Sequence, residues 1–371
     1  MRNLKNHSPE AIERALRMEG GSRKVSFSYD LLDVHDVRIG TLGGVERGSI
    51  SHGEFRVIPR SAKFRIDRRE SRDINFMSDR IQPYFAIHMP EGGTVEFPLG
   101  IFLPESPDTA TNGSASTQDI GAYDKTIIVE QDRFIRRFFA RKGERVIEVV
   151  RRILETAGIT RIDMAESDAE LIADTEYPTG EKKLLACNDL LRKINHTTLW
   201  VDEYGFMRAG PYVEPSGRAV TKKYATDRDS VTMPVFVRSM DIATRPNVFK
   251  RVAVNIGEEA ELTSVFINDD ALSPISTVSR GRQIVDYEEI NDTMGQKALD
   301  ELTRRIAIES TGAFEHFSFG TAPMPHGHGE TLYLDFPEVF EAPAKFHEVS
   351  WEMPLVAGGE MKHVARRVAR L

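Results

Sequence analysis

Alternation of polar and apolar residues is the feature that most constrains how this chain can fold. The pattern is clearest in residues 43–66, which read GGVERGSISHGEFRVIPRSAKFRI, and it is most regular from Ala62 through Phe64 to Ile66. A period of two residues is typical of a β-strand with one face packed on a core. The segment holds no nucleophile beside a base and no phosphate-binding glycine pattern, so it indicates a structural role for these residues.

The side chains of this segment have predicted places. Three glycines, Gly43, Gly44 and Gly48, indicate turns or a tight bend in a small barrel. The residues predicted to fill the inside are Phe55, Val57, Phe64 and Ile66. The residues predicted to face a neighbouring molecule or a channel are Arg56, Arg60, Lys63 and Arg65.

Similar short segments continue to Glu130, separated by glycines and charged turns. The predicted strands include 24–34, 37–45, 48–53, 54–67, 74–89 and 94–107. A Gly/Ser/Thr-rich break at 107–118 predicts an exposed loop or the tip of a long hairpin, and 120–130 (IGAYDKTIIVE) predicts a closing strand. Several short strands at this spacing are typical of a sandwich or a small barrel.

Helical periodicity is confined to a few segments. Residues 8–20 predict a helix that Ser8 caps, Pro9 opens and Gly20–Gly21 ends. Apolar stripes predict further helices at 143–159, 181–196 and 293–309, and a hairpin is predicted at 198–208. Strands return at 231–268 and after residue 315. The sequence therefore predicts an α+β, mainly β fold, with a β unit, a mostly helical segment and a second, interrupted β unit.

Length and charge narrow the function classes. A chain of 371 residues can bury a sizeable core in two or three domains. Its net charge of −8 argues against a dedicated DNA-binding protein, although not against a protein that DNA merely passes. The single cysteine excludes intramolecular disulfides, the N-terminal segment lacks the apolar core of a secretory signal, and no apolar run predicts a membrane-spanning helix.

Candidate metal and catalytic residues give weak signals. His326 and His328 lie two apart in MPHGHGE, with Glu330 beyond, but a metal site needs three or four ligands, so a turn before a strand is predicted. Cys187 lies in the apolar stripe of its helix and is predicted to be a buried structural thiol. The adjacent acid pairs Asp269–Asp270, Glu258–Glu259 and Glu288–Glu289 are predicted to be solvated loop charge. No catalytic, cofactor-binding or metal residue is therefore assigned, and no cofactor is expected.

The basic stretch 132–152 leaves three interpretations open. Its arginines are interleaved with Phe134, Phe138 and Phe139. They could contact nucleic acid or a membrane surface, form a solvated face above packed phenylalanines, or form an assembly interface.

Several segments in order resemble the hub proteins of phage tails and baseplates. The resemblance begins with YDLLD (29–33), RIGTLGGVERGSIS (38–51) and INFMSDRIQPY (74–84). It continues through FPLGIFLPESP (97–107), GAYDKTIIVEQD (121–132) and ETAGI (155–159), and ends with GHGETLYLDF and SWEMPLVAGGEMKH (350–363). It covers most of the chain, but it rests on order and texture and on no single diagnostic motif.

The resemblance implies a homotrimer in which each subunit contributes two tube-like β-barrels to a ring of six around a channel. The implied domains are a helical arm at 1–21, a first barrel at 22–130, an accessory domain formed by 131–204 with 246–311, and a second barrel formed by 205–245 with 312–371. The sequence ends at residue 371 without the lysozyme or peptidase domain of some hubs, so no lytic activity is expected.

The function predicted from the resemblance is a structural hub of the tail tip or baseplate. The ring would join the tail tube or a distal tail protein to central spike or fibre proteins, with the tape measure protein as a further partner, and DNA would pass without specific binding. The protein would be assembled in the host cytoplasm and reside in the virion. Two alternatives stay open: a cell-wall- or carbohydrate-active tail protein, and a nucleic-acid-binding protein that uses residues 133–152.

Overall fold

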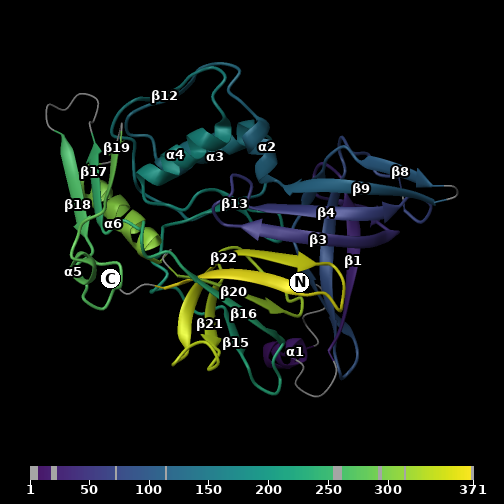
Figure 1. The fold of residues 1–371 in the computed structure, drawn as a ribbon. Coiled ribbons are helices and arrows are strands. Elements are labelled where there is room, and N and C mark those ends of the chain that lie inside the picture. The colour runs from purple at the N-terminus through teal and green to yellow at the C-terminus, as the bar shows by residue number, and fades with distance from the viewer. Residues whose placement is uncertain are drawn as a thin grey trace.

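The computed structural model describes residues 7–17, 23–71, 73–112, 115–253, 261–290, 295–312 and 315–368. In these ranges the chain is mainly β with mostly antiparallel pairing, which confirms the predicted fold class (Figure 1). Closure of the strands into two barrels stays a prediction. Among the described residues, the helices are too short or too polar to cross a bilayer.

A first β region occupies the N-terminal third of the chain. Its strands are β1 (Lys24–Leu32), β2 (Arg38–Thr41), β3 (Val45–Gly53), β4 (Arg60–Asp67), β5 (Arg80–His88), β6 (Thr94–Pro98), β7 (Phe102–Pro104), β8 (Asp108–Asn112) and β9 (Ala115–Asp124). They follow the order β3-β4-β9-β7-β5-β1-β2, with β6 beside β5 and β8 beside β9. The β8–β9 hairpin is one of the two alternatives predicted for residues 107–118.

A second β region is assembled from later strands. They are β15 (Lys222–Ala225), β16 (Thr232–Met240), β20 (Glu315–Thr321), β21 (Thr331–Asp335), β22 (Ala344–Pro354) and β23 (Met361–Arg367). The order is β16-β20-β23-β22, with β21 also paired to β22 and β15 paired to β21.

Strand β22 joins the two β regions into one sheet. Its first part pairs with β21 and β23, and its last residues, from Ser350 to Pro354, pair with β3. In Figure 1 the yellow C-terminal strands accordingly lie directly beside the purple strands β3 and β4. One apolar core spans both regions, with Ile81 and Phe85 from the first and Phe317 and Phe346 from the second.

Helix α1 (Pro9–Leu16) packs on this shared core. Ile12, Ala15 and Leu16 are buried, and Ser8 Oγ accepts a hydrogen bond from the backbone N–H of Ala11 at 3.2 Å, as the predicted cap requires. The predicted stop at Gly20–Gly21 lies outside the described residues.

A helical region follows the first β region. Its elements are α2 (Thr126–Gln131), β10 (Phe138–Ala140), α3 (Val146–Thr156), β11 (Ile162–Met164), β12 (Thr175–Tyr177), α4 (Lys183–Lys193), β13 (Trp200–Val201) and β14 (Met207–Ala209). The apolar stripes of α3 and α4 face each other and form a separate core, which includes Val149, Ile153 and Leu190.

A small lateral sheet carries the remaining helices. Its elements are β17 (Val248–Ala253), β18 (Leu262–Ile267), α5 (Thr277–Arg280), β19 (Val285–Ile290) and α6 (Gln296–Gly312). Leu299 and Leu302 of α6 pack on Ala253 and Ile290 in a cluster separate from that of the helical region. The predicted domain boundaries, which place 131–204 and 246–311 together, stay a prediction.

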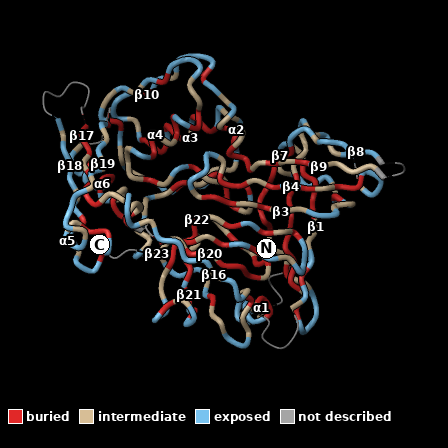
Figure 2. The backbone as a smooth tube through the Cα atoms, viewed as in Figure 1, coloured by how far each residue is buried: buried red, intermediate tan, exposed pale blue. Residues whose placement is uncertain are grey.

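Buried residues are concentrated in the central strands and in the two packed helices α3 and α4 (Figure 2). Figure 2 shows red, buried segments in the strands at the centre of the molecule and in α3 and α4. The lateral sheet and the hairpins at the periphery are mostly pale blue or tan. The charged residues buried at the centre therefore bear most directly on how the parts are held together.

The prediction of one strand over 54–67 is wrong. Residues 54–59 form a turn that the backbone N–H of Gly53 closes on the carbonyl of Pro59 at 2.9 Å, and β4 begins only at Arg60. Pro59 has no N–H with which to extend a ladder. The pattern of alternation is thus interrupted between Glu54 and Pro59.

Two other strand predictions extend too far. Residues 74–79, predicted to belong to a strand, form a turn in which the backbone N–H of Asn75 donates to Asp79 Oδ2 at 2.9 Å. The predicted strand at 120–130 ends at Asp124, because Asp124 Oδ1 accepts the backbone N–H of Thr126 at 2.8 Å and α2 begins there. A short apolar run such as TIIV does not distinguish helix from strand.

Candidate functional site

The apolar side chains of segment 43–66 differ in their burial. Phe64 and Ile66 are buried as predicted, whereas Phe55 and Val57, predicted to lie inside, are 58% and 65% exposed. The turn at 54–59 turns their side chains away from the core. The predicted inner and outer faces of β4 are therefore correct only after Arg60.

Arg60 is the main correction to the predicted outward face. Its exposure is 1%, its guanidinium forms an ion pair with Glu203, and the same group lies 5.7 Å from the ring centroid of Trp351. Its backbone N–H donates to Asp124 Oδ2 at 2.9 Å. Arg60 thus connects β4 to the β13–β14 turn of the helical region and to β22 of the second β region.

A ring stack extends this contact. His328 stacks on Trp200 with ring centroids 4.5 Å apart, and its Nδ1 lies 3.0 Å from His52 Nε2. His52 in turn stacks on Trp351 at 5.5 Å. We call the set Arg60, His52, Trp200, Glu203, His328 and Trp351 the junction. Burial lowers the pKa of His328 to about 4 and the pKa of His52 well below its usual range, so both rings are neutral near pH 7.

A second buried ion cluster reinforces the same boundary. Asp36 accepts Lys125 Nζ at 2.8 Å, pairs with Arg80, and lies 3.5 Å from Arg161 Nε. Lys125 Nζ also donates to the carbonyl of Gly205 at 3.0 Å. Burial lowers the pKa of Lys125. The first β region and the helical region are therefore held together by two sets of buried charges.

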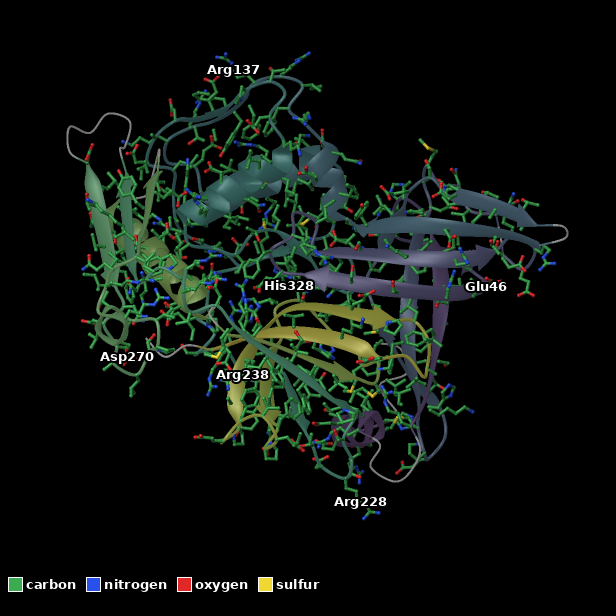
Figure 3. All side chains as sticks on the ribbon, viewed as in Figure 1. Glu46, Arg137, Arg228, Arg238, Asp270 and His328 are labelled. Atoms are coloured by element: carbon green, nitrogen blue, oxygen red, sulfur yellow. The ribbon has the colours of Figure 1, made fainter. Side chains whose placement is uncertain are left out.

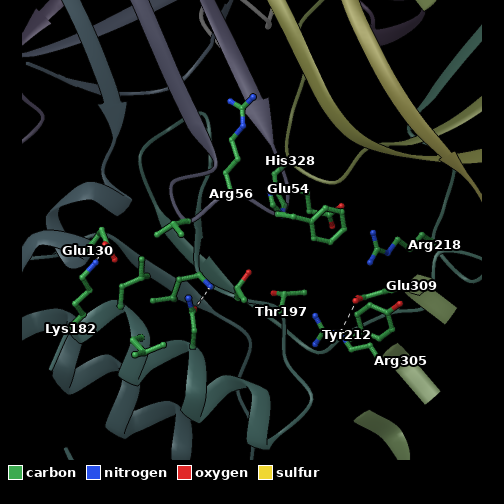
Figure 4. A pocket seen from close by; sticks show the side chains of 17 residues that line it. Glu54, Arg56, Glu130, Lys182, Thr197, Tyr212, Arg218, Arg305, Glu309 and His328 are labelled. Atoms are coloured by element: carbon green, nitrogen blue, oxygen red, sulfur yellow. Dashed lines mark hydrogen bonds and ion pairs between the residues drawn. The ribbon is translucent and has the colours of Figure 1, made fainter. Parts of the chain in front are cut away.

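A cavity of about 500 Å³ opens beside the junction. Figure 4 shows that its wall combines the turn at 54–57, helix α4, helix α6 and the loop that carries His328. Its charges are largely matched, since Lys182 pairs with Glu130 and Arg305 Nε lies 3.0 Å from Glu309 Oε1. The cavity lies between packed regions, and Arg56 and Arg218 in its wall contact Ser51 and His347.

The structure separates the two histidines of MPHGHGE. His328 points into the junction, near the centre of Figure 3, whereas His326 is buried in the second β region beside Glu348 and His363. Burial lowers the pKa of His326 well below its usual range and that of His363 to about 3, and it raises the pKa of Glu348. Glu330, the third residue of the sequence candidate, accepts the N–H of Gly327 at 3.0 Å.

The other sequence candidates lie apart from one another. Cys187 is fully buried in the core of α3 and α4, and burial raises its pKa. Glu288 lies 3.2 Å from Arg251, Asp270 accepts the backbone N–H of Leu272, and Glu258–Glu259 lies outside the described residues. These placements bring no nucleophile beside a base and no two of these acid pairs to one site.

Four of the eight basic residues in the stretch 132–152 are paired with acids. These ion pairs are Arg137 with Glu176, Arg145 with Asp168, Arg151 with Glu166, and Arg152 with Glu144. Phe134 is buried and Phe138 stacks on it at 5.1 Å, while Phe139 stays half exposed. The arrangement agrees with a solvated face above packed phenylalanines and weakens the nucleic-acid interpretation.

Two surface regions contain strands with exposed apolar side chains. Strand β16 ends the sheet path with β20 as its partner in the described chain, and its Val235 and Val237 are exposed. The outer sheet face consists of Val265, Ile267, Val285 and Tyr287 on β18 and β19, all exposed and aligned in register across β17. Exposed strand edges and apolar patches are typical of surfaces that another chain covers.

Sequence reasoning missed the junction and the buried histidine cluster. Arg60 was predicted to face outward because of its charge, although alternation with Ala62 and Phe64 places it on the inner face, and its partner Glu203 lies far along the chain. His52, Glu348 and His363 sit in strands whose sequence shows no metal or catalytic spacing. The only available signal was the pair of tryptophans, because buried tryptophans usually pack where a polar group can reach the indole N–H; here Trp351 donates to the carbonyl of Gly327 at 3.0 Å.

Comparison with known proteins gives a fold relationship. No protein-family model matches the sequence, and no curated protein matches it. A tail protein from Neisseria meningitidis is similar in structure, with a TM-score of 0.67 and 11% identity over 92% of this chain and 97% of that one. The 43 kDa tail protein of prophage MuSo2 from Shewanella oneidensis has a TM-score of 0.62 and 9% identity, over 91% and 98% of the two chains.

A third similar structure extends beyond phage proteins. A chain of the Francisella PdpA–VgrG complex has a TM-score of 0.58 and 9% identity, and it covers 98% of this chain and 61% of its own length. At these identities the likeness concerns the fold. The chain therefore has the fold of these two tail proteins over about nine-tenths of its length.

Proposed function

We propose that this chain is a structural hub protein of a bacteriophage tail tip or baseplate. The observation that carries the proposal is the shared fold, which extends over nine-tenths of this chain and of two tail proteins from different bacteria. Agreement over more than nine-tenths of each chain supports a common role in architecture more strongly than a shared sheet would.

In the proposed assembly three copies form a ring in which each contributes two β regions, so that six similar units surround a channel. The continuous pairing of β22 with β3 supports this arrangement, because it fixes the two regions of one chain side by side. The free edge of β16 and the exposed outer sheet face supply surfaces for neighbours. Closed symmetry would cover such edges and prevent open-ended growth.

The proposed partners follow from this position. The ring joins the tail tube or a distal tail protein to central spike or fibre proteins, and the tape measure protein is a further candidate. Three chains carry a net charge of about −24, which favours passage of DNA without binding. The protein is then a virion component assembled in the host cytoplasm.

A structural role without catalysis is part of the proposal. The buried ionisable groups of the junction hold strands together, and the sequence candidates for a nucleophile and for acid catalysis lie apart. Incubation with purified peptidoglycan is expected to release no soluble fragments. Released muropeptides, lost on removal of the protein, would contradict this part of the proposal.

The oligomeric state tests the proposal directly. Light scattering coupled to size-exclusion chromatography is expected to give three times the chain mass at micromolar concentration. A dilution series then reports how tightly the ring is held. A mass of one chain at every concentration would count against the trimeric ring.

A further inference from the structure

Three ionisable residues meet inside the second β region. His326 lies in the loop before β21, Glu348 on β22 and His363 on β23, and all three are buried. One ligand atom from each, two ring nitrogens and one carboxylate oxygen, lie within 4.8 Å of one another. Side chains from three separate segments therefore converge on one point in the core.

A β-bulge in β22 orients the side chain of Glu348 toward this point. In the pairing of β22 with β23, Glu348 is opposite Ala365 and Ser350 is opposite Val364, so Val349 forms a bulge. Because of the bulge, Glu348 and Trp351 both face the core although they are three residues apart. Bulges often redirect a side chain next to a functional site.

The hydrogen bonds around His363 determine which of its two ring nitrogens carries no hydrogen. Thr321 Oγ1 donates to the carbonyl of Ala322 at 2.9 Å and lies 2.8 Å from His363 Nε2. Since the hydroxyl has one hydrogen, its oxygen then accepts from His363 Nε2. The lone pair of His363 Nδ1 is left facing Glu348 Oε1 at 2.6 Å.

The same reasoning applies to His326. Its Nδ1 lies 3.4 Å from the carbonyl of Met324, which can only accept, so this nitrogen carries the hydrogen. The lone pair of His326 Nε2 faces Glu348 Oε2 at 3.3 Å. Glu348 Oε2 is fully buried and accepts no hydrogen bond from the residues that the structure describes.

The contact of Glu348 Oε2 with His326 Nε2 has no hydrogen-bond donor between the two atoms among the described residues, and the Tyr224 hydroxyl approaches the same nitrogen only at 3.5 Å, the limit of a hydrogen bond. A single proton on Glu348 would form a hydrogen bond to one histidine nitrogen. The other nitrogen–oxygen contact would still lack a hydrogen. Rotating the Thr321 hydroxyl toward His363 satisfies Glu348 Oε1 and still leaves Oε2 opposite His326. A divalent cation accepts both nitrogens and the carboxylate at once.

We propose that His326, Glu348 and His363 bind a structural divalent metal ion, zinc in the first place. Two imidazoles and one carboxylate are a common zinc donor set. Each histidine presents its other ring nitrogen to an oxygen acceptor, Met324 or Thr321, as metal-bound histidines usually do. The hydroxyl of Tyr224, 3.5 Å from His326 Nε2, is placed to supply or orient a fourth ligand.

Such an ion would fasten the loop 322–330 to β22 and β23. The same loop carries His328 into the junction, so the metal would also stabilise the contact with Trp200. This inference does not depend on the proposed tail function. It departs from the sequence expectation of no metal, because the second and third ligands come from strands that the MPHGHGE motif does not include.

Metal content tests the site. The full chain is refolded with zinc chloride or with cobalt chloride, desalted, and measured by plasma mass spectrometry. One ion per chain is expected, with a higher Tm than the metal-free protein and a cobalt spectrum typical of nitrogen and oxygen ligands. The Glu348→Gln variant is expected to lose the ion. His347→Gln, on the same strand and beside Glu54, is the matched control that retains it.

Three results would overturn the site. The wild-type chain refolds without bound zinc or cobalt, or Glu348→Gln retains the ion, or His347→Gln loses it as completely as Glu348→Gln. If Glu348→Gln does not fold, X-ray absorption of the wild-type zinc form decides. That spectrum is expected to show two histidine nitrogens with a carboxylate oxygen, and any other ligand set contradicts the proposal.

Discussion

The two β regions share one sheet but differ in what they bury. The first region packs apolar residues such as Leu31, Ile50 and Phe85 inside, and its buried charges Arg60 and Lys125 lie at the boundary with the helical region. The second region buries Glu348 and two histidines within its own core. The first region also buries Asp30 and Asp67, but each pairs with an exposed arginine, whereas the buried Glu348 of the second region faces two histidines, so the second region depends more on how its polar cluster is satisfied.

The largest expected effect comes from the apolar core that the regions share. Phe317 is fully buried among Phe236, Phe319, Phe336, Phe340 and Phe346. Phe317→Ala is expected to lower the free energy of unfolding by about 3–5 kcal/mol. Chemical denaturation measures this change, and Phe85→Ala is the matched variant in the first region.

Hydrogen exchange then tests whether the regions unfold together. Because β22 pairs with β3, Phe317→Ala is expected to reduce protection in β4 and β5 as well as in β20 and β23. Loss of protection confined to the second region would show that the shared sheet does not couple them.

A smaller effect is expected at the junction. Glu203→Gln leaves the guanidinium of Arg60 buried without its carboxylate, and this is expected to cost about 2 kcal/mol, since Glu203 is partly exposed. Adding Arg60→Met should recover much of the loss, because an apolar side chain of similar length needs no partner. Urea denaturation compares the variants, with the exposed pair Arg137–Glu176 as control. Equal losses in the single and double variants would contradict the assignment.

The junction also predicts a pH dependence. Burial lowers the pKa of His52 well below 6.5 in the folded chain, so the unfolded chain takes up a proton that the folded chain does not. The contribution of His52 is therefore complete above about pH 6.5 and lost as the pH falls below that value. His52→Gln is expected to flatten the fall of Tm in this acidic range. An unchanged slope would show that His52 has the same pKa in the folded and the unfolded chain, which contradicts the assignment.

The smallest effect on the single chain is expected at the edge strand. Val237 is exposed on β16, so Val237→Lys should change the free energy of unfolding by less than about 0.5 kcal/mol. A charge on this strand is expected to weaken association of the chains. Light scattering of Val237→Lys beside Met77→Lys, an exposed loop control, measures the difference. Equal association in both variants would exclude β16 from the interface.

The sequence predicted local features well and long-range ones poorly. Phe64 and Ile66 are buried where alternation places them, and Ser8 caps its helix. Arg60 lies on the same face as Phe64 and Ile66, as alternation requires, but its charge argued for an outward position and its partner Glu203 lies in a distant turn. Alternation cannot reveal the bulge at Val349 either, since the extra residue reverses the face of every residue that follows it.

The candidate site shows the same limit more strongly. The motif MPHGHGE predicted one local pair, but the chain sends His326 and His328 into different surroundings. Each histidine lies beside residues from other strands: His326 is near His363, and His328 is near His52. Only the register of β22 with β3 and β23 brings these residues together.

Electron microscopy of the assembled full chain tests the central claim most directly. The account predicts class averages with threefold symmetry, a central hole and six similar β units around it. Rings of another symmetry, or compact single chains without a hole, would contradict the proposed tail hub.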